Sequence, residues 1–158
     1  MKLLIVLFSL VAFCSAQIFV TDCLLSHNIE RSKVGDLPLI WDAALAASSQ
    51  AYAIKLAATG TFKHSGTPGV GENLALGTSE RYSTGYNTTA LIKLWLNEKK
   101  NYIEGCTYPD CGSGVGHYTQ MIWAKTKTVG CGKGTDGSID ILVCQYFPPG
   151  NYIGEEVN

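Results

Sequence analysis

The sequence predicts an α/β domain of three layers, with helices covering both faces of a central sheet. Helical periodicity occurs in three segments, at residues 21–34, 42–60 and 89–103. The segment 139–147 has the composition of a strand that is apolar on both faces, and such a strand needs cover on both sides. Helices before and after the strands can supply that cover, which favours an α-β-α sandwich over an open sandwich of two sheets.

The first residues are typical of an export signal. Lys2 precedes an apolar run, and the small residues Cys14-Ser15-Ala16 follow it, so we expect a signal peptide over residues 1–16. The apolar run is too short to span a bilayer comfortably, and no second run of about 20 apolar residues follows. Residues 17–158 have the usual size of a single domain. We therefore expect one secreted domain without a transmembrane segment.

The first two helices have recognisable ends. Thr21 is placed to cap the start of the first helix, and Gly35 lies just past its end, where a left-handed backbone is easiest. The second helix can begin after Asp42 as its N-cap and run to Gly60. Small residues along this second helix would let it lie close to a sheet.

Residues 60–85 are rich in glycine, threonine, serine and proline, which indicates loops and short strands. Helical periodicity returns over Thr89–Ile103, where Glu98 falls on the same face as Leu91 and Trp95. A carboxylate on an apolar face costs roughly several kcal/mol unless partners satisfy it. The fold must therefore bring Glu98 a donor, a cation or water.

The C-terminal part reads as a loop, a short helix and a hairpin. Residues 105–116 form a glycine-rich loop, and a short helical piece follows at Tyr118–Trp123. Residues 128–132 and 139–147 are typical of two strands joined by a tight turn.

The cysteines predict two disulfides and one free thiol. Of six cysteines, Cys14 leaves with the signal peptide, so one of the remaining five must be unpaired. In a hairpin that turns at residues 137–138, Cys131 and Cys144 face each other directly. The five-residue separation of Cys106 and Cys111 can close a small loop, which leaves Cys23 free.

Charge argues against two classes of partner. The chain has 12 Lys plus Arg against 13 Asp plus Glu, and the basic residues are scattered. Neither a nucleic-acid-binding stripe nor a polybasic membrane patch is visible. Export would make Asn87, in Asn87-Thr88-Thr89, a glycosylation site.

Two histidines and two acids are candidates for chemistry. His64 and His117 lie beside glycine-rich sequence, and Glu72 follows Gly71 in a run that is otherwise apolar or small. A single histidine is more often a hydrogen-bonded packing or surface residue than a ligand. These patterns alone leave the role of the four side chains open.

Several motifs, in order along the chain, resemble the CAP superfamily of cysteine-rich secretory, antigen 5 and pathogenesis-related 1 proteins. The two longest similarities are Gly116-His117-Tyr118-Thr119-Gln120-Met121-Ile122-Trp123 with Val129-Gly130-Cys131-Gly132, and Val143-Cys144-Gln145-Tyr146-Phe147-Pro148-Pro149-Gly150-Asn151-Tyr152. The shorter ones are His27-Asn28 with Arg31, Leu39-Ile40-Trp41-Asp42, His64-Ser65, Gly71-Glu72-Asn73-Leu74, and Trp95 with Glu98.

This resemblance implies an α-β-α sandwich of the CAP (SCP) type, with a central cleft formed by two histidines and two acids. The matching positions are His64, Glu72, Glu98 and His117. Paired imidazoles near carboxylates suit a divalent metal such as zinc, bound reversibly through His64 and His117. The equally weighted alternative is a hydrogen-bonded polar cluster without metal.

Three functions follow from the resemblance. The first is a noncatalytic secreted protein that binds a sterol, a fatty acid or another small lipid through the loop at residues 105–116, with Tyr102 and Tyr108 near it and separate from the cleft. The second is a hydrolase with a histidine base and a metal or Ser65, although neither Gly-x-Ser-x-Gly nor His-Glu-x-x-His occurs. The third is an extracellular defence or signalling factor that acts on a protein or cell-surface target.

Overall fold

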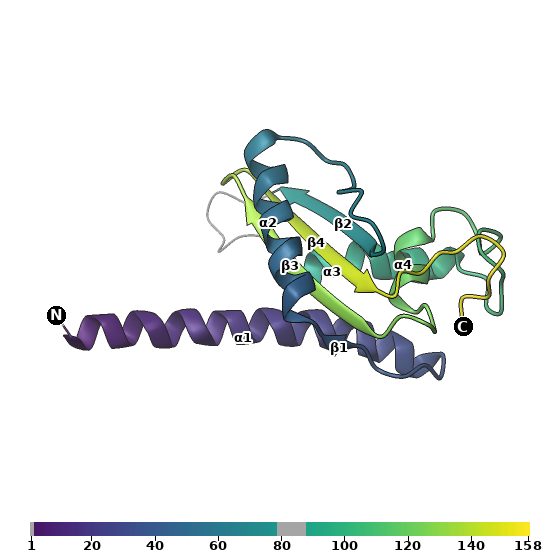
Figure 1. Ribbon diagram of the computed structural model, residues 1–158, viewed down its shortest axis with the longest axis horizontal. Coiled ribbons are helices and arrows are strands. Elements are labelled where there is room, and N and C mark those ends of the chain that lie inside the picture. The colour runs from purple at the N-terminus through teal and green to yellow at the C-terminus, as the bar shows by residue number, and fades with distance from the viewer. Residues whose placement is uncertain (1, 79–87) are drawn as a thin grey trace.

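The computed structural model describes the backbone of residues 2–78 and 88–158, and the side chains of residue 17, residues 19–78 and residues 88–158. Helices and strands follow one another as shown in Figure 1. Their bounds are α1 Lys2–Lys33, β1 Ile40–Trp41, α2 Ala43–Thr59, β2 Gly71–Thr78, α3 Thr88–Leu96, the 3-10 helix η1 Asn97–Asn101, α4 Gly116–Met121, β3 Thr128–Thr135 and β4 Ile139–Phe147.

The sheet has four strands in the order β1-β3-β4-β2. The short β1 pairs in parallel with β3, whereas β4 is antiparallel to both of its neighbours. The hairpin register places Cys131 opposite Cys144, as predicted. The two predicted disulfides, Cys106–Cys111 and Cys131–Cys144, are both present, and Cys23 is a buried free thiol.

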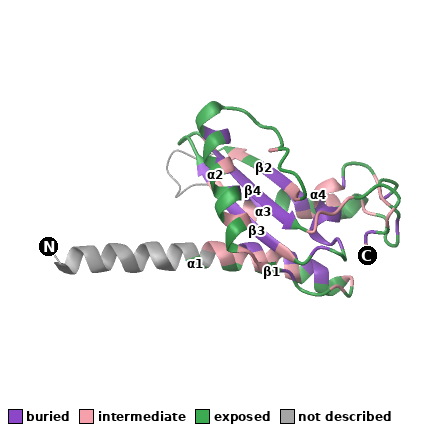
Figure 2. Ribbon diagram, in the orientation of Figure 1, coloured by how far each residue is buried: buried purple, intermediate pink, exposed green. Residues whose placement is uncertain are grey.

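The central strand β4 is buried on both faces, and each face contacts a different helix layer. Leu142 and Tyr146 share a cluster with side chains of α1 and α3, whereas Ile141 and Val143 pack against α2. Figure 1 shows α2 on one side of the sheet and α3 on the other, and Figure 2 shows the buried colour running along β3 and β4 between them. The predicted α-β-α sandwich is confirmed.

Helix α2 forms where its end signals place it. The Asp42 side chain accepts hydrogen bonds from the backbone N–H groups of Ala44 and Leu45, at 2.8 and 3.0 Å. Gly60 ends the helix in the left-handed region at φ 62°. The predicted bounds of this helix are confirmed.

Helix α1 differs from the prediction at its N-terminal end. It ends at Lys33, before Gly35, which has the expected positive φ of 82°. It begins at Lys2, however, so Thr21 lies inside the helix and does not cap it. The prediction failed because residues 2–20 contain no glycine or proline to stop the helix before Thr21.

Two further elements differ from the prediction. The region predicted as loops and short strands contains the eight-residue strand β2. The predicted helix over residues 89–103 ends at Leu96 and tightens into the 3-10 helix η1, which contains Glu98. Within the part of the chain that the structure describes, no helix combines the length and apolar character of a membrane span. The predicted glycosylation site, Asn87, lies outside the described residues.

Candidate functional site

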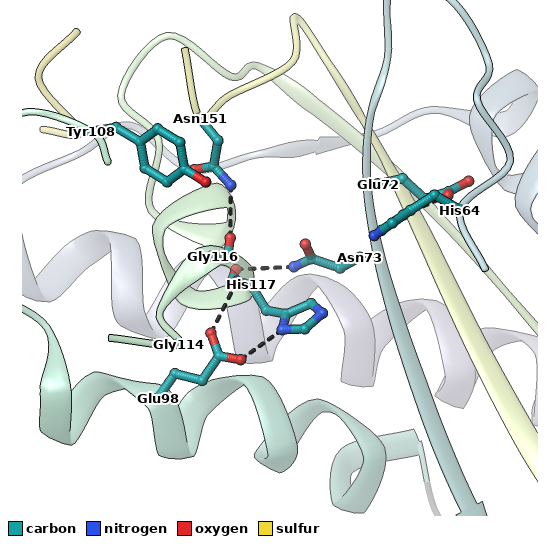
Figure 3. A pocket seen from close by; sticks show the side chains of 9 residues that line it. All are labelled: His64, Glu72, Asn73, Glu98, Tyr108, Gly114, Gly116, His117 and Asn151. Atoms are coloured by element: carbon teal, nitrogen blue, oxygen red, sulfur yellow. Dashed lines mark hydrogen bonds and ion pairs between the residues drawn. The ribbon is translucent and has the colours of Figure 1, made fainter. Parts of the chain in front are cut away.

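The four candidate residues line one cleft with a volume of about 310 Å³ (Figure 3). The cleft lies where η1, α4, the N-terminal end of β2 and two loops meet. Its lining residues are His64, Glu72, Asn73, Glu98, Tyr108, Gly114, Gly116, His117 and Asn151. The structure thus brings together all four residues of the predicted tetrad.

Glu98 and His117 form the first of two acid–imidazole pairs. His117 Nδ1 donates to Glu98 Oε1 at 2.6 Å. The other carboxylate oxygen, Oε2, accepts the backbone N–H groups of His117 and Tyr118 at 2.9 and 3.0 Å. These amides belong to the first turn of α4 and have no partner within the helix. Glu98 therefore satisfies both the helix end and the imidazole, which explains an acid beside an apolar core.

His117 is held by two further contacts, one to its ring and one to its backbone. It stacks on Trp95 of α3, with ring centroids 6.1 Å apart and an interplanar angle of 14°. The His117 carbonyl accepts a hydrogen bond from Asn73 Nδ2 at 3.0 Å. Side chains from three elements, α3, η1 and β2, therefore hold this imidazole in one orientation.

Glu72 and His64 form the second pair. His64 Nδ1 donates to Glu72 Oε1 at 2.9 Å, and the Ser65 backbone N–H donates to the same oxygen at 2.8 Å. Glu72 Oε2 accepts from Gln145 Nε2 of β4 at 3.1 Å. Tyr52 of α2 anchors the loop before His64 by donating to the Lys63 carbonyl at 2.8 Å.

These donors keep Glu72 ionised. Burial alone would raise the pKa of this carboxyl group, but hydrogen bonds from Ser65, Gln145 and His64 outweigh burial, so its pKa lies below the usual value. The Glu72 side chain is only 6% exposed, whereas the His64 side chain is 62% exposed. Glu72 is thus buried and holds the exposed His64 ring by a hydrogen bond.

The two pairs present the same atoms to the cleft. In each histidine Nδ1 is occupied by a carboxylate, so Nε2 is left for a ligand. Figure 3 shows a ring nitrogen of each histidine directed toward the space between His64 and His117. A carboxylate that accepts from one ring nitrogen fixes the tautomer and makes the other a better metal ligand. These residues fit a divalent metal.

The tetrad is nevertheless not assembled as a closed metal site. Among the described residues, the group of three or more His, Cys, Asp or Glu ligand atoms that lie within 4.8 Å of one another is Cys23, Cys131 and Cys144. A structural zinc site usually has four protein ligands. Two imidazoles from separate pairs would instead form an open site in which water completes the coordination.

A buried chain of hydrogen bonds lies behind His117. His27 Nδ1 donates to the Cys23 carbonyl at 2.7 Å, so Nε2 of the neutral ring accepts from the Tyr146 hydroxyl at 2.8 Å. Asn73 Nδ2 donates to both the Tyr146 hydroxyl, at 3.1 Å, and the His117 carbonyl. Helix α1 is thereby connected through β4 and β2 to the cleft.

Two cleft residues were missed by the sequence reasoning. Asn73 follows Glu72 in a motif that was recognised, so its place in that motif was the available signal. Asn151 has a positive φ of 60°, donates to the Gly116 carbonyl at 2.8 Å and accepts from Thr119 at 2.7 Å. Asn151 also lies in a recognised motif, but the motif does not reveal this contact, which joins the C-terminal segment to α4.

The two tyrosines of the predicted lipid loop lie in different places. Tyr108 lines the same cleft as the tetrad, whereas the sequence predicted it at a loop site separate from the cleft. Tyr102 packs edge-on against Tyr118, with ring centroids 5.3 Å apart, and its hydroxyl donates to Asn158 at 2.5 Å. The structure places Tyr102 in a packed cluster, not on the cleft wall.

The Ser65 hydroxyl contacts Thr67 and the Glu72 carboxylate and is not paired with a histidine. It pairs with the Thr67 hydroxyl at 2.9 Å and also accepts the Thr67 backbone N–H. Among the described contacts, neither His64 nor His117 approaches this hydroxyl. A serine nucleophile needs a base within hydrogen-bonding reach.

The model of the cysteine-rich secretory protein (CAP) family matches residues 24–146, so the chain belongs to that family. Pathogenesis-related protein 1C of Nicotiana tabacum is 39% identical over 144 residues, which cover 90% of this chain and 82% of that protein. Pathogenesis-related protein 1 of Arabidopsis thaliana is 36% identical over 149 residues, covering 94% and 88%.

Solved structures agree with this assignment. BmVAL-1 superposes with a TM-score of 0.73 at 29% identity, over 87% of this chain and 80% of that chain. NaASP2, solved with Zn²⁺, has a TM-score of 0.70 at 26% identity, over 87% and 83%. The fold and the motifs therefore lead to the same family.

Proposed function

We propose that this chain is a noncatalytic extracellular CAP protein whose cleft binds a divalent cation such as zinc reversibly. One observation carries the proposal: each cleft histidine has its Nδ1 on a glutamate and its Nε2 free for a ligand in the same cleft. His64 and His117 are the ligands. Glu72 and Glu98 orient them and balance the charge of the cation.

Reversibility follows from the donor set. Two imidazoles and water bind zinc less tightly than four protein ligands do. His64 is on a loop and is largely exposed, so it can move toward or away from His117 without disturbing the core. The NaASP2 structure with Zn²⁺ supports a metal-binding role within this fold.

Export and processing belong to the same proposal. Residues 1–16 act as a signal peptide, residues 17–158 form the mature domain, and Asn87 carries a glycan. The similarity to plant pathogenesis-related proteins supports an extracellular defence or signalling role, exerted on a protein or cell-surface target.

The noncatalytic reading rests on the site's hydrogen bonds. The Ser65 hydroxyl contacts Thr67 and Glu72 instead of a histidine, and both oxygens of each cleft acid accept hydrogen bonds. The pKa of Glu72 is lowered by its hydrogen-bond donors, which is the opposite of what a general acid needs. A screen of peptide and ester substrates is the direct test of the hydrolase alternative.

Zinc affinity should depend on both members of each pair. Calorimetric titration is expected to show one zinc bound by the wild type and none in the cleft of the His64→Ala/His117→Ala variant. Glu98→Gln should weaken binding by about 10- to 100-fold, because a hydrogen-bonding partner of a metal ligand typically contributes that much.

Glu155→Gln is the matched control, since Glu155 forms a surface pair with Lys125 at 2.7 Å and does not line the cleft. It should bind zinc as the wild type does. Equal zinc affinity in the wild type and in the double alanine variant would contradict the proposal.

Binding of a sterol or another small lipid is the second candidate function. The observation that favours it is the Tyr108 ring on the cleft wall, because aromatic rings can cover a sterol face. Tyr108→Ala should lower cholesterol affinity by about 1 to 3 kcal/mol if the ring is buried against ligand. Tyr152→Ala is the control, since Tyr152 is half exposed and does not line the cleft.

Because Tyr108 and the tetrad share one cleft, zinc and sterol should compete. Saturating zinc is expected to raise the apparent dissociation constant for cholesterol in the wild type. A lipid site outside the cleft would be indicated by either of two results. One is unchanged cholesterol affinity in Tyr108→Ala, and the other is a cholesterol dissociation constant that saturating zinc does not change.

A further inference from the structure

Three sulfur atoms lie together in the core. The Sγ atoms of Cys23, Cys131 and Cys144 are all within 4.8 Å of one another. Cys131 and Cys144 are joined as a disulfide between β3 and β4, whereas Cys23 of α1 is a free thiol. A thiol this close to a disulfide has the reaction partners for thiol–disulfide exchange already in place.

We propose that Cys23, Cys131 and Cys144 form a thiol–disulfide exchange site. In it, Cys23 forms a new disulfide with Cys144, and Cys131 is released as a free thiol that small electrophiles can modify. The exchange would replace a bond within the sheet by a covalent bond between α1 and β4. It is independent of the His/Glu cleft and of the proposed function.

A groove at the surface borders Cys131, the cysteine that the exchange would release. Cys131 lines a cavity of about 520 Å³ between α1, β1 and α2, whereas Cys23 and Cys144 do not line it. The other lining residues are Phe19, Val20, Trp41, Ala46, Ala47 and Gln50. Of the three cysteines, Cys131 is therefore the one that borders this groove, although it is only 2% exposed.

The exchange balances without an oxidant or a reductant. The Cys23 thiol gives its proton to hydroxide, and the thiolate attacks Cys144 Sγ. The Cys23–Cys144 bond forms as the Cys131–Cys144 bond breaks. The electron pair of the broken bond stays on Cys131 Sγ, which then takes a proton from water. One disulfide and one thiol are present before and after.

The surroundings of Cys23 hold this reaction back. Burial, followed by the nearby charge of Asp22, raises the pKa of the Cys23 thiol, so little thiolate exists at neutral pH. The other titratable groups around it are His27 of the same helix and Tyr146 of β4, while the α3 side chains in the cluster are apolar. Exchange should thus be slow and should accelerate with pH.

Trapping with iodoacetamide tests the proposal on the folded full chain. Native protein is incubated with the reagent at pH 7.5 and at pH 8.5, then digested and mapped without reduction. We expect molecules with alkylated Cys131 and a Cys23–Cys144 disulfide, formed about tenfold faster at the higher pH because thiolate rises tenfold per unit below the thiol pKa. Circular dichroism must stay unchanged throughout.

Two controls distinguish exchange from general scrambling. In Cys23→Ser, Cys131 and Cys144 should stay paired and unlabelled under the same conditions. The Cys106–Cys111 disulfide should remain intact in both proteins, because it is not part of the three-sulfur group.

Three results would overturn the proposal. They are an intact Cys131–Cys144 disulfide in all wild-type molecules after prolonged incubation at pH 8.5, alkylation of Cys131 in the Cys23→Ser variant, and release of Cys144 in place of Cys131. The last would show that the groove does not select the freed thiol.

Discussion

Replacing Gly132 with alanine is expected to destabilise the domain by about 3 kcal/mol or more, a large share of the about 5 to 15 kcal/mol that a domain of this kind has. Gly130, Gly132 and Gly134 of β3 all face α2 at alternate positions. A Cβ on Gly132 would lie 2.2 Å from the backbone N and Cα of Gln50. Helix α2 cannot retreat easily, because Gln50 also pairs with both backbone groups of Lys133.

Urea unfolding of Gly132→Ala against the wild type measures this effect. Gly116→Ala is the matched control, because a Cβ there meets only Asn151 Nδ2 at 4.0 Å, and alanine is the better helix former. The control should stay within about 1 kcal/mol of the wild type. A Gly132→Ala protein as stable as the control would show that α2 does not lie against the sheet this closely.

Acidification from pH 6.5 to pH 4 is expected to remove about 3 kcal/mol of stability through His27 alone. Burial, assisted by the charge of Arg31 and opposed by the Cys23 carbonyl, lowers the pKa of His27 from 6.5 to about 4. The unfolded chain therefore binds a proton over this range while the folded chain does not. Stability falls as pH falls, and this loss is complete below the folded-state pKa.

Unfolding of wild type and His27→Gln in urea from pH 7 to pH 4 isolates this contribution. The carboxyl groups titrate in both proteins, so the difference between the two slopes belongs to His27. NMR titration of the wild-type imidazole should show it neutral until about pH 4. Equal acid slopes in both proteins, or protonation near pH 6.5, would contradict the burial of a neutral His27.

The fold could be predicted well where local chemistry decides the structure. Asp42 and Gly60 mark α2 by their own capping interactions, and the turn at residues 136–138 sets the register that pairs Cys131 with Cys144. The strand β2 was not predicted as such. Its sequence, Gly71–Thr78, has a glycine at or next to each end and does not alternate between apolar and polar residues, and its formation depends on pairing with β4.

The residues of the candidate site could be predicted from the sequence, but the contacts that hold them in place could not. The family resemblance supplied His64, Glu72, Glu98 and His117, which the structure brings into one cleft. The role of Glu98 at the start of α4 depends on the change from α3 to η1, which helical periodicity does not reveal. Tyr108 reaches the cleft only because the chain folds back after η1, so its position could not be read from sequence spacing.

Zinc location is the most direct test of a metal-binding cleft. Crystals grown with zinc at a concentration that saturates the calorimetric site should be measured on both sides of the zinc absorption edge. We predict an anomalous peak about 2.0 to 2.1 Å from Nε2 of both His64 and His117, with each Nδ1 still on its glutamate. A zinc peak elsewhere on the protein, with none in the cleft, would contradict the proposed function.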